Sequence, residues 1–351
     1  MRKQNAENTD GMSGKEPADP HNEETGSGRK NKKKGRKTGL FTLLCAGLFI
    51  VSFVASNMIH KAYQNHYVGK YSVDWSDEIG TVYTDMVYGE GEANKFDLYV
   101  PADHSREAYG LIVYLHAGGF TTGDKSGDAD VLKYYCSLGY VTAGINYTLR
   151  TDNHPEANVY TQSMEIKEAV PYVVEEAKEL GYNCDRLCLS GGSAGGCLAL
   201  IYAYRDAADS PIPVKMVFEG VGPSSFYPED WKCYGADKNV EVAAGLFGVM
   251  RGETVDPAIF GTEEYDELMK PISALLWVDE NTVPTVLAYG KYDKVQPYEG
   301  AVRLDARLTE AGVEHTFIVC EHSGHGLQND SRQFAAYYAA VEEYLGKYMS
   351  E

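Results

Sequence analysis

The strongest constraint on the fold is a stretch in the middle of the chain, RLCLSGGSAGGCLAL, which covers residues 186–200. It opens with a short apolar run typical of a buried parallel strand, narrows to a glycine-rich turn, and continues as a good helix former. The spacing Gly191-x-Ser193-x-Gly195 is that of a nucleophile elbow, a strained strand-to-helix turn with a serine at its tip. The alternative is a glycine-rich turn whose serine only caps the helix. Partners elsewhere in the chain must decide between the two.

Strand and helix patterns alternate on both sides of this stretch. Short apolar runs predict strands over residues 81–88, 95–100, 111–115, 141–147, 187–189, 214–219, 284–289 and 315–320. Helical patterns cover residues 130–138, 164–180, 298–311 and 331–348. This alternation predicts an α/β fold over residues 81–351, with a mostly parallel sheet and helices on both faces.

One interval interrupts the alternation. Residues 222–283, approximately, carry many aromatic side chains and one plausible helix over residues 240–250. A loop of this length inside a compact domain is usually a functional lid or an insertion. The aromatic side chains can instead pack into a small core of the segment itself, and both can hold at once.

The N-terminal region predicts a membrane anchor. Residues 1–38 read as a disordered basic cytoplasmic tail, and residues 39–59 form an uncharged apolar stretch close to the length of a membrane helix. The basic cluster at residues 29–37 places the N-terminus in the cytoplasm and the following domain outside it. Residues 60–80 are a linker or an N-terminal cap. A cleaved signal peptide, and hence a secreted protein, is the alternative.

The charge is distributed unevenly. Residues 1–38 carry ten Lys/Arg against six Asp/Glu, a net of +4, so the rest of a chain of net −19 carries −23. So acidic a body repels nucleic acid, and a DNA or RNA partner is not expected.

The seven cysteines show no metal-binding pattern. Cys45 lies in the apolar segment, and the other six are interpreted as free, largely buried hydrophobes. One disulfide stays open if the domain is outside the cell.

A serine nucleophile needs a histidine base within hydrogen-bond reach and a carboxylate that orients the base. The acid candidate is Asp293, just beyond a predicted strand, where catalytic groups gather at the edge of an open α/β sheet. Asp279 and Glu280 are alternatives that precede that strand. The base candidate is His325, between two glycines after the last strand, and His322 is its competitor.

Backbone N–H donors for an oxyanion are expected from the sequence HAGGF, residues 116–120, directly after the third strand. It matches an HGGG-type loop, so the predicted donors are Gly118, Gly119 and, after the serine, Ala194. An ordinary strand-to-helix turn is the alternative for these glycines.

Together these motifs resemble bacterial α/β-hydrolase esterases of the hormone-sensitive-lipase-like and acetyl-xylan/feruloyl-esterase (BD-FAE-like) type. The resemblance runs from residue 81 to residue 348. It is carried by His116-Ala117-Gly118-Gly119-Phe120, Gly123-Asp124-Lys125, Asn146-Tyr147-x-Leu149, Gly192-Ser193-Ala194-Gly195-Gly196, Asp293 and His325-Gly326. It implies the α/β-hydrolase fold and serine ester hydrolysis with no metal or organic cofactor. Ala117 replaces a usual glycine, and Gly192 replaces the acidic residue often found before the serine, which puts pKa tuning or selectivity in question.

The expected function is hydrolysis of short-acyl esters, with acetylated carbohydrates as one candidate, through an acyl-enzyme on Ser193. Two alternatives remain. A membrane-anchored serine peptidase of the prolyl-oligopeptidase type shares the fold, but it usually has bulky aromatic neighbours around the serine and a large N-terminal propeller. A catalytically silent binding module on the same fold is disfavoured by the intact Ser, Asp and His. The oligomeric state is left open.

Overall fold

The computed structural model describes residues 41, 44–59, 61–62, 66 and 69–350, and the chain divides into two compact units, Met1–His60 and Lys61–Glu351. The predicted tail lies outside the described residues, as do residues 39, 40, 42 and 43 of the predicted anchor and residues 60, 63–65, 67 and 68 of the predicted linker. Residues 44–59 of the first unit are helical. Within the described ranges, no helix combines the length and the apolar character that crossing a membrane requires.

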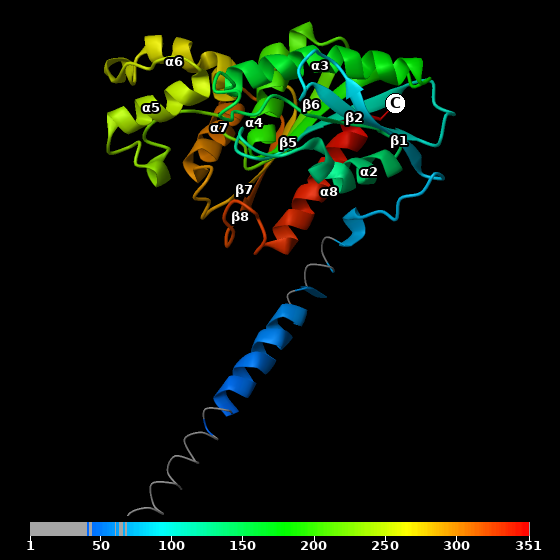
Figure 1. Cartoon of the computed structure of the whole chain (residues 1–351), viewed down its shortest axis with the longest axis horizontal. Helices are drawn as coiled ribbons and strands as arrows, with labels where there is room; N and C mark the ends of the chain where they lie inside the picture. The colour runs from blue at the N-terminus through cyan, green and yellow to red at the C-terminus, as the bar shows by residue number, and fades with distance from the viewer. Residues whose placement is uncertain (1–40, 42–43, 60, 63–65, 67–68, 351) are drawn as a thin grey trace, which may run out of the picture. The chain divides into compact units, whose positions relative to one another are not determined.

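The second unit is built on one eight-stranded sheet of order β1-β2-β4-β3-β5-β6-β7-β8 (Figure 1). The strands are β1 (Gly80–Val87), β2 (Lys95–Pro101), β3 (Tyr109–Leu115), β4 (Val141–Ile145), β5 (Cys184–Gly192), β6 (Val214–Gly220), β7 (Thr285–Gly290) and β8 (His315–Cys320). Only β2 runs against its neighbours, and all pairs from β4 to β8 are parallel. The predicted mostly parallel sheet is therefore confirmed.

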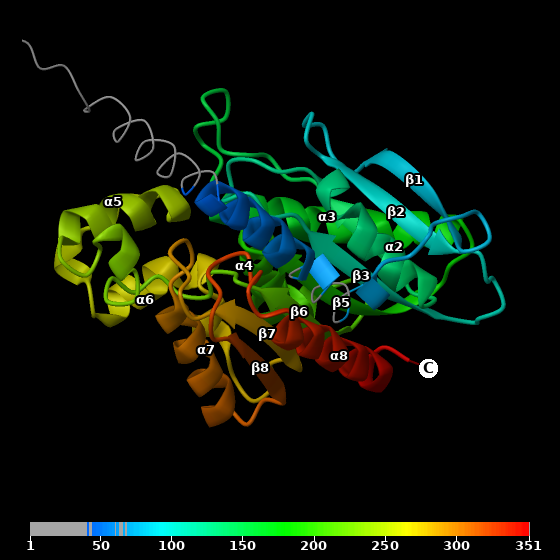
Figure 2. The ribbon, with the colours of Figure 1, turned by 90° about the horizontal axis from the view of Figure 1, so that it is seen from below.

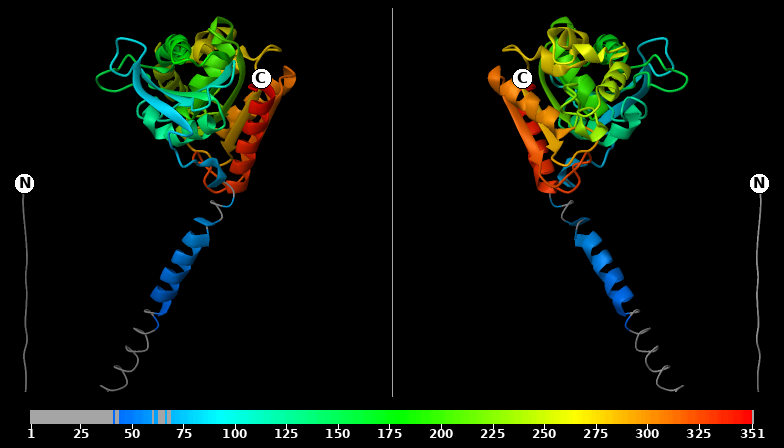
Figure 3. Two further views of the ribbon diagram at one scale, coloured as in Figure 1. Left: turned by 90° about the vertical axis from the view of Figure 1, so that its right-hand side faces the viewer. Right: turned by 90° about the vertical axis from the view of Figure 1, so that its left-hand side faces the viewer.

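Helices cover both faces of this sheet (Figure 2). One face carries α2 (Ala129–Ser137) and α8 (Ser331–Tyr348), and the other carries α3 (Val159–Glu179), α4 (Ala194–Ile201) and α7 (Tyr298–Glu310). Figure 3 shows α8, in red, running alongside β8 at one edge of the sheet. Because helices lie on both faces, central strands such as β4 and β7 are buried along their whole length.

Short helical turns complete the second unit. They are η1 (Gly69–Tyr71), η2 (Lys125–Asp128), η3 (Tyr202–Asp206), η4 (Ala207–Asp209), η5 (Lys232–Tyr234), η6 (Pro257–Ile259), η7 (Lys270–Ile272) and η8 (Ala274–Trp277). Tyr71 of η1 stacks on Tyr338 of α8 with ring centroids 4.3 Å apart, so the segment before β1 packs on the domain.

The predicted elements coincide with the observed ones to within about two residues, with two exceptions. The strand predicted over residues 187–189 extends from Cys184 to Gly192, and α3 begins at Val159 rather than at residue 164. A capping box explains the early start of α3. The Asn158 side chain accepts a hydrogen bond from the Thr161 N–H, and the Thr161 hydroxyl accepts one from the Asn158 N–H.

The segment between β6 and β7 forms a lobe that contains α5 (Val240–Arg251) and α6 (Glu263–Met269), drawn in yellow-green in Figure 1. Its aromatic side chains pack on one another: Phe226 stacks on Trp231 at 5.7 Å between centroids, and Phe247 meets both edge-on. The segment therefore has a core of its own, as one of the two interpretations of its aromatic residues expected.

All seven cysteines are free, and five of them are buried. The exceptions are Cys45 and Cys233, which are exposed. Interpretation of the buried cysteines as small hydrophobes is therefore confirmed, and the disulfide left open by the sequence does not form.

Candidate active site

The turn between β5 and α4 has the geometry of a nucleophile elbow. Ser193 adopts φ +54° and ψ −118°, a conformation that L residues rarely accept, and its N–H donates to the Gly220 carbonyl at 2.8 Å. A Cβ on Gly195 would lie 1.9 Å from the Leu115 carbonyl oxygen, and one on Gly191 would lie 2.4 Å from the Gly195 backbone. Glycine is therefore required at positions 191 and 195, because neighbouring backbone atoms occupy the space that a side chain would need.

Asp293 and His325 reach Ser193 from two later loops. Asp293 follows β7 and His325 follows β8, at the carboxyl edge of the sheet where β5 also ends. The His325 Nε2 lies 2.9 Å from the Ser193 Oγ, and the His325 Nδ1 lies 2.7 Å from an Asp293 carboxylate oxygen. The fold thus brings the three predicted residues into one hydrogen-bonded row.

Backbone N–H groups hold the Asp293 carboxylate in a fixed orientation towards His325. The Asp293 side chain is fully buried, and its second oxygen accepts the N–H groups of Val295 at 2.8 Å and Gln296 at 2.9 Å. These bonds aim the other oxygen at the His325 Nδ1. With the proton on Nδ1, Nε2 is left as the acceptor for the serine hydroxyl. The two clamping N–H groups carry no sequence signal, because any residue supplies a backbone N–H.

The alternative acids and base lie elsewhere. The His322 side chain is 78 % exposed, and its Nδ1 pairs with Asp330 at 2.9 Å. Asp279 accepts the Asn281 N–H in an exposed turn before β7, and Glu280 is exposed in the same turn. None of the three joins the row.

The predicted oxyanion loop, residues 116–120, leaves β3 beside the elbow. Gly119 and Ala194 line the same cavity as Ser193, whereas Gly118 does not line that cavity. Gly118 instead packs against the following turn, because a Cβ there would lie 1.8 Å from the Thr122 carbonyl oxygen. Ala194 is the first residue of α4, so its N–H has no acceptor within the helix. Two of the three predicted donors thus line the cavity of the nucleophile.

The remaining motif residues hold this loop. The Tyr147 hydroxyl donates to the His116 carbonyl at 2.8 Å, and the two rings stack at 4.3 Å. The Asn146 side chain donates to Asp124 and accepts the Lys125 N–H, both at 2.7 Å. These motifs therefore support the oxyanion loop rather than face the reacting atoms.

The cavity over Ser193 has a volume of about 110 Å³. The segment between β6 and β7 contributes Pro223, Trp231, Tyr234 and Met250 to its wall. The sequence marks this segment as a candidate lid but does not single out these four residues, because aromatic and apolar residues also fill the segment's own core.

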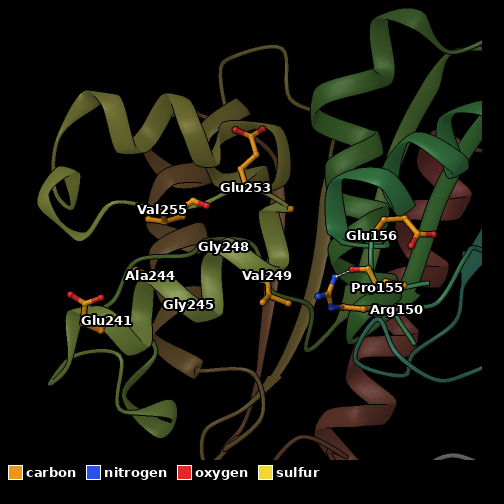
Figure 4. Close-up of a pocket in the computed structure, with 12 residues that line it drawn as sticks. Arg150, Pro155, Glu156, Glu241, Ala244, Gly245, Gly248, Val249, Glu253 and Val255 are labelled. Atoms are coloured by element: carbon orange, nitrogen blue, oxygen red, sulfur yellow. Dashed lines mark hydrogen bonds between the residues drawn. The ribbon is translucent and has the colours of Figure 1, made fainter. Parts of the chain in front are cut away.

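A larger hollow of about 540 Å³ lies between the loop around Arg150 and α5 (Figure 4). Glu156, Glu241 and Glu253 surround it, and none of the three residues of the Ser193 row lines it. The larger volume of this hollow therefore does not mark the candidate active site.

A buried acid lies beneath the elbow. Glu219 of β6 is fully buried, and burial raises the pKa of its carboxyl to about 8. One oxygen accepts the Gly222 N–H at 2.7 Å, and the other has no partner among the described residues. Burial thus favours the protonated carboxyl. Its bond to Gly222 supports the turn that follows β6, next to Gly220, whose carbonyl accepts the Ser193 N–H.

Residues 96–308 match the family BD-FAE. Among curated proteins, an ethyl acetate hydrolase of Pseudomonas putida is 32% identical over 218 residues, 61% of this chain and 64% of that protein. A probable carboxylic ester hydrolase, LipM, of Mycobacterium tuberculosis is 28% identical over 151 residues, 39% of this chain and 34% of that protein. The chain therefore matches between about a third and two thirds of the length of these two relatives.

Solved structures show the same fold. A truncated carbohydrate esterase from gut microbiota superposes with a TM-score of 0.59 at 18% identity, covering 77% of this chain and 98% of that one. Esterase B from Lactobacillus rhamnosis gives 0.59 at 19% identity, covering 85% of this chain and 95% of that one. The chain has the α/β-hydrolase fold and belongs to the BD-FAE family.

Proposed function

We propose that this protein is a serine carboxylic-ester hydrolase that works through an acyl-enzyme on Ser193. The observation that carries the proposal is the row in which one imidazole lies 2.9 Å from the Ser193 hydroxyl and 2.7 Å from the Asp293 carboxylate. Membership of the BD-FAE family and the hydrolase and esterase names of the relatives support it.

In the first half of the reaction, the Ser193 Oγ attacks the ester carbonyl carbon while the His325 Nε2 takes the hydroxyl proton. The carbonyl oxygen becomes an oxyanion, which the N–H groups of Gly119 and Ala194 bind, since both residues line the cavity. Gly118, the third predicted donor, precedes Gly119 in the same loop. The intermediate collapses, the C–O bond to the alcohol breaks, and His325 gives its proton to the departing oxygen. The buried carboxylate of Asp293 stabilises the imidazolium between these two transfers.

In the second half, His325 takes a proton from water, and the resulting hydroxide attacks the acyl carbon. The second intermediate expels the Ser193 Oγ, which recovers its proton from His325, and the acid leaves. One ester and one water are consumed, and one alcohol and one acid are released.

The substrates are short-acyl esters, with acetylated carbohydrates as one candidate. The cavity of about 110 Å³ beside the oxyanion donors has room for a short acyl group, and Trp231, Tyr234 and Met250 form its wall. The segment that carries these side chains acts as a lid over Ser193. The names ethyl acetate hydrolase and carbohydrate esterase, borne by similar proteins, agree with both choices.

The test measures p-nitrophenyl acetate hydrolysis and fluorophosphonate labelling of the fragment of residues 61–351. Ser193→Ala is expected to abolish labelling and to lower kcat at least ~10³-fold, since only the oxyanion donors and binding then remain. Ser210→Ala, outside the row, serves as the control. If the folded wild-type fragment neither reacts with the fluorophosphonate nor hydrolyses any ester, the proposal is wrong and the catalytically silent binding module is favoured.

For localisation, we propose a single-pass anchor over residues 39–59, with the N-terminus cytoplasmic and the hydrolase domain extracytoplasmic. The basic cluster before the apolar stretch supports this orientation. Carbonate extraction of membranes should leave the full chain in the pellet, and protease added to spheroplasts should digest the domain. Release of a shortened chain into the medium would indicate the secreted alternative.

A further inference from the structure

A second cavity, of about 150 Å³, opens on the other side of the elbow. It lies on the face of the sheet that α2 and α8 cover, and it shares His325 with the cavity over Ser193. Its walls are mainly aromatic rings and glycine backbone. The residues that line it are Tyr114, Val131, Tyr135, Gly191, Gly192, Phe218, Gly220, Val221, His325, Gly326, Leu327, Phe334, Tyr337 and Tyr338.

Hydroxyl groups without partners lie in and beside this cavity. Tyr135 lines it and is 1% exposed, yet its hydroxyl has no hydrogen-bond partner in the part of the chain that the structure describes. The same holds for the fully buried hydroxyl of Ser190. Ser190 pairs in register with Tyr114 and Phe218, so its side chain lies on the same face between two residues of the wall. Buried hydroxyls rarely stay unpaired, so a water or a ligand is the natural partner for these two groups, which find none among the described residues.

Gly192 leaves this cavity open to the elbow. A Cβ at Gly191 or Gly195 would collide with backbone, but one at Gly192 would meet only the Tyr114 hydroxyl, at 3.7 Å. The backbone of Gly192 also lies outside the left-handed region. Neither crowding nor conformation therefore requires glycine here. Because Gly192 has no side chain, the space next to Ser193 stays empty.

The chemistry of the ester assigns the two cavities. The oxyanion donors Gly119 and Ala194 line the cavity of about 110 Å³, so the carbonyl and its acyl chain belong there. The departing alcohol oxygen must receive its proton from His325. His325 lines both cavities, and Gly326 and Leu327, which follow it, continue the wall into the second one only. An alcohol oxygen that takes its proton from His325 can therefore extend its ring into the second cavity.

We propose that the second cavity is the subsite for the alcohol part of the ester, that it takes a six-membered ring bearing a hydroxyl group, and that Gly192 and Tyr135 determine this specificity. The inference rests on the proposed function. A cavity of about 150 Å³ in another protein holds benzene, so the volume suits one such ring. The aromatic walls contact the ring, and the Tyr135 hydroxyl pairs with the ligand hydroxyl.

The phenols suit this role because they stay neutral. Burial raises the pKa of the Tyr135 and Tyr337 phenols well above the usual value, and raises that of Tyr338 to about 12. Each can therefore both donate to and accept from a ligand hydroxyl.

The experiment compares kcat/KM for 2-hydroxycyclohexyl acetate, cyclohexyl acetate and methyl acetate in the fragment of residues 61–351. The wild type is expected to prefer the hydroxylated ring over cyclohexyl acetate at least fivefold. Tyr135→Phe should lower that preference about five- to tenfold, the value of one hydrogen bond. Folding should not suffer, because the lost hydroxyl has no partner in the described part of the chain. Tyr172→Phe on the exposed side of α3 is the matched control.

Gly192→Leu should fill the cavity and lower kcat/KM for both ring esters, relative to methyl acetate, at least tenfold. Gly192→Ala, for which there is room, should give a smaller loss of about threefold and covers the case in which the leucine variant does not fold.

Three results would overturn the proposal: no preference in the wild type, an equal loss on both ring esters in Tyr135→Phe, or an unchanged ring-to-methyl ratio in both Gly192 variants. The cavity would then hold water only. Failure of the proposed function looks different, because no ester would be turned over and the fluorophosphonate would not label Ser193.

Discussion

Ser193 holds a backbone conformation that costs free energy, and the surrounding chain compensates for that cost. Its φ of +54° is sparsely populated by residues other than glycine. The bond from its N–H to the Gly220 carbonyl and the close approach of Gly195 to Leu115 leave the turn no room to relax. This conformation points the hydroxyl towards His325 rather than into the helix end, as the proposed mechanism requires.

At the same scale, Asp293→Asn tests how the imidazole is oriented. An asparagine amide can donate to the His325 Nδ1, which leaves the ring proton on Nε2, where it cannot accept the serine proton. We expect kcat for p-nitrophenyl acetate to fall about 10³–10⁴-fold. His322→Gln, at the exposed histidine that pairs with Asp330, should stay within about twofold of the wild type. A large loss in His322→Gln with a small loss in Asp293→Asn would reverse the assignment.

Glu219 should make stability depend on pH. Burial raises the pKa of its carboxyl in the folded chain to about 8, from 4.5. Between about pH 5 and 8 the unfolded chain has lost this proton while the folded chain keeps it, so the free energy of unfolding falls as the pH rises. Glu219→Gln cannot ionise and should remove up to about 4 kcal/mol of that fall. Urea unfolding of the fragment at pH 5 and pH 8 measures it, and parallel slopes for both proteins would contradict it.

At the scale of elements, strand and helix positions could be predicted because periodicity and glycine placement are local. The final helix, Ser331–Tyr348, and the strand His315–Cys320 match their predicted bounds. The start of α3 was missed because an asparagine–threonine capping box overrides the weak apolar pattern of residues 159–163. The wall of the cavity over Ser193 could not be predicted, since the positions of Trp231 and Met250 depend on how α5 packs.

Met250 on α5 should restrict the length of the acyl chain. It lines the cavity over Ser193, so Met250→Ala enlarges that cavity. We expect the kcat/KM ratio of p-nitrophenyl hexanoate to acetate to rise about tenfold. Val249→Ala is the matched control, because that neighbouring side chain is 47% exposed and lines the separate hollow of Figure 4. An equal rise in both variants would mean that the segment had loosened as a whole.

At the scale of the whole molecule, the parallel arrangement of the strands brings the residues of the candidate site together. Strands β3, β5, β7 and β8 end at one edge, and the loops that follow them carry residues 116–120, Ser193, Asp293 and His325. Residues separated by 132 positions, Ser193 and His325, thereby come within 2.9 Å.

The compact unit Lys61–Glu351 contains the sheet, its helices and the candidate site, so it should fold and work alone. We expect the fragment to unfold in one cooperative transition and to match the kcat/KM of the detergent-solubilised full chain within about twofold. Calorimetry and p-nitrophenyl acetate assays check this. A tenfold deficit in the folded fragment would show that the preceding residues take part in the site.

The sequence by itself determined the α/β alternation, the elbow around Ser193 and the short list of acids and bases, because these depend on local periodicity and on which residue types a turn tolerates. Only the tertiary structure decided that His325 rather than His322 meets Ser193 and that backbone N–H groups clamp Asp293. It alone also placed Gly192 on a cavity lined by Tyr135, whose hydroxyl has no partner within the described ranges. Those outcomes depend on contacts between elements far apart in the chain. No local pattern encodes such contacts, because burial and hydrogen-bond partners are fixed only when the layers pack.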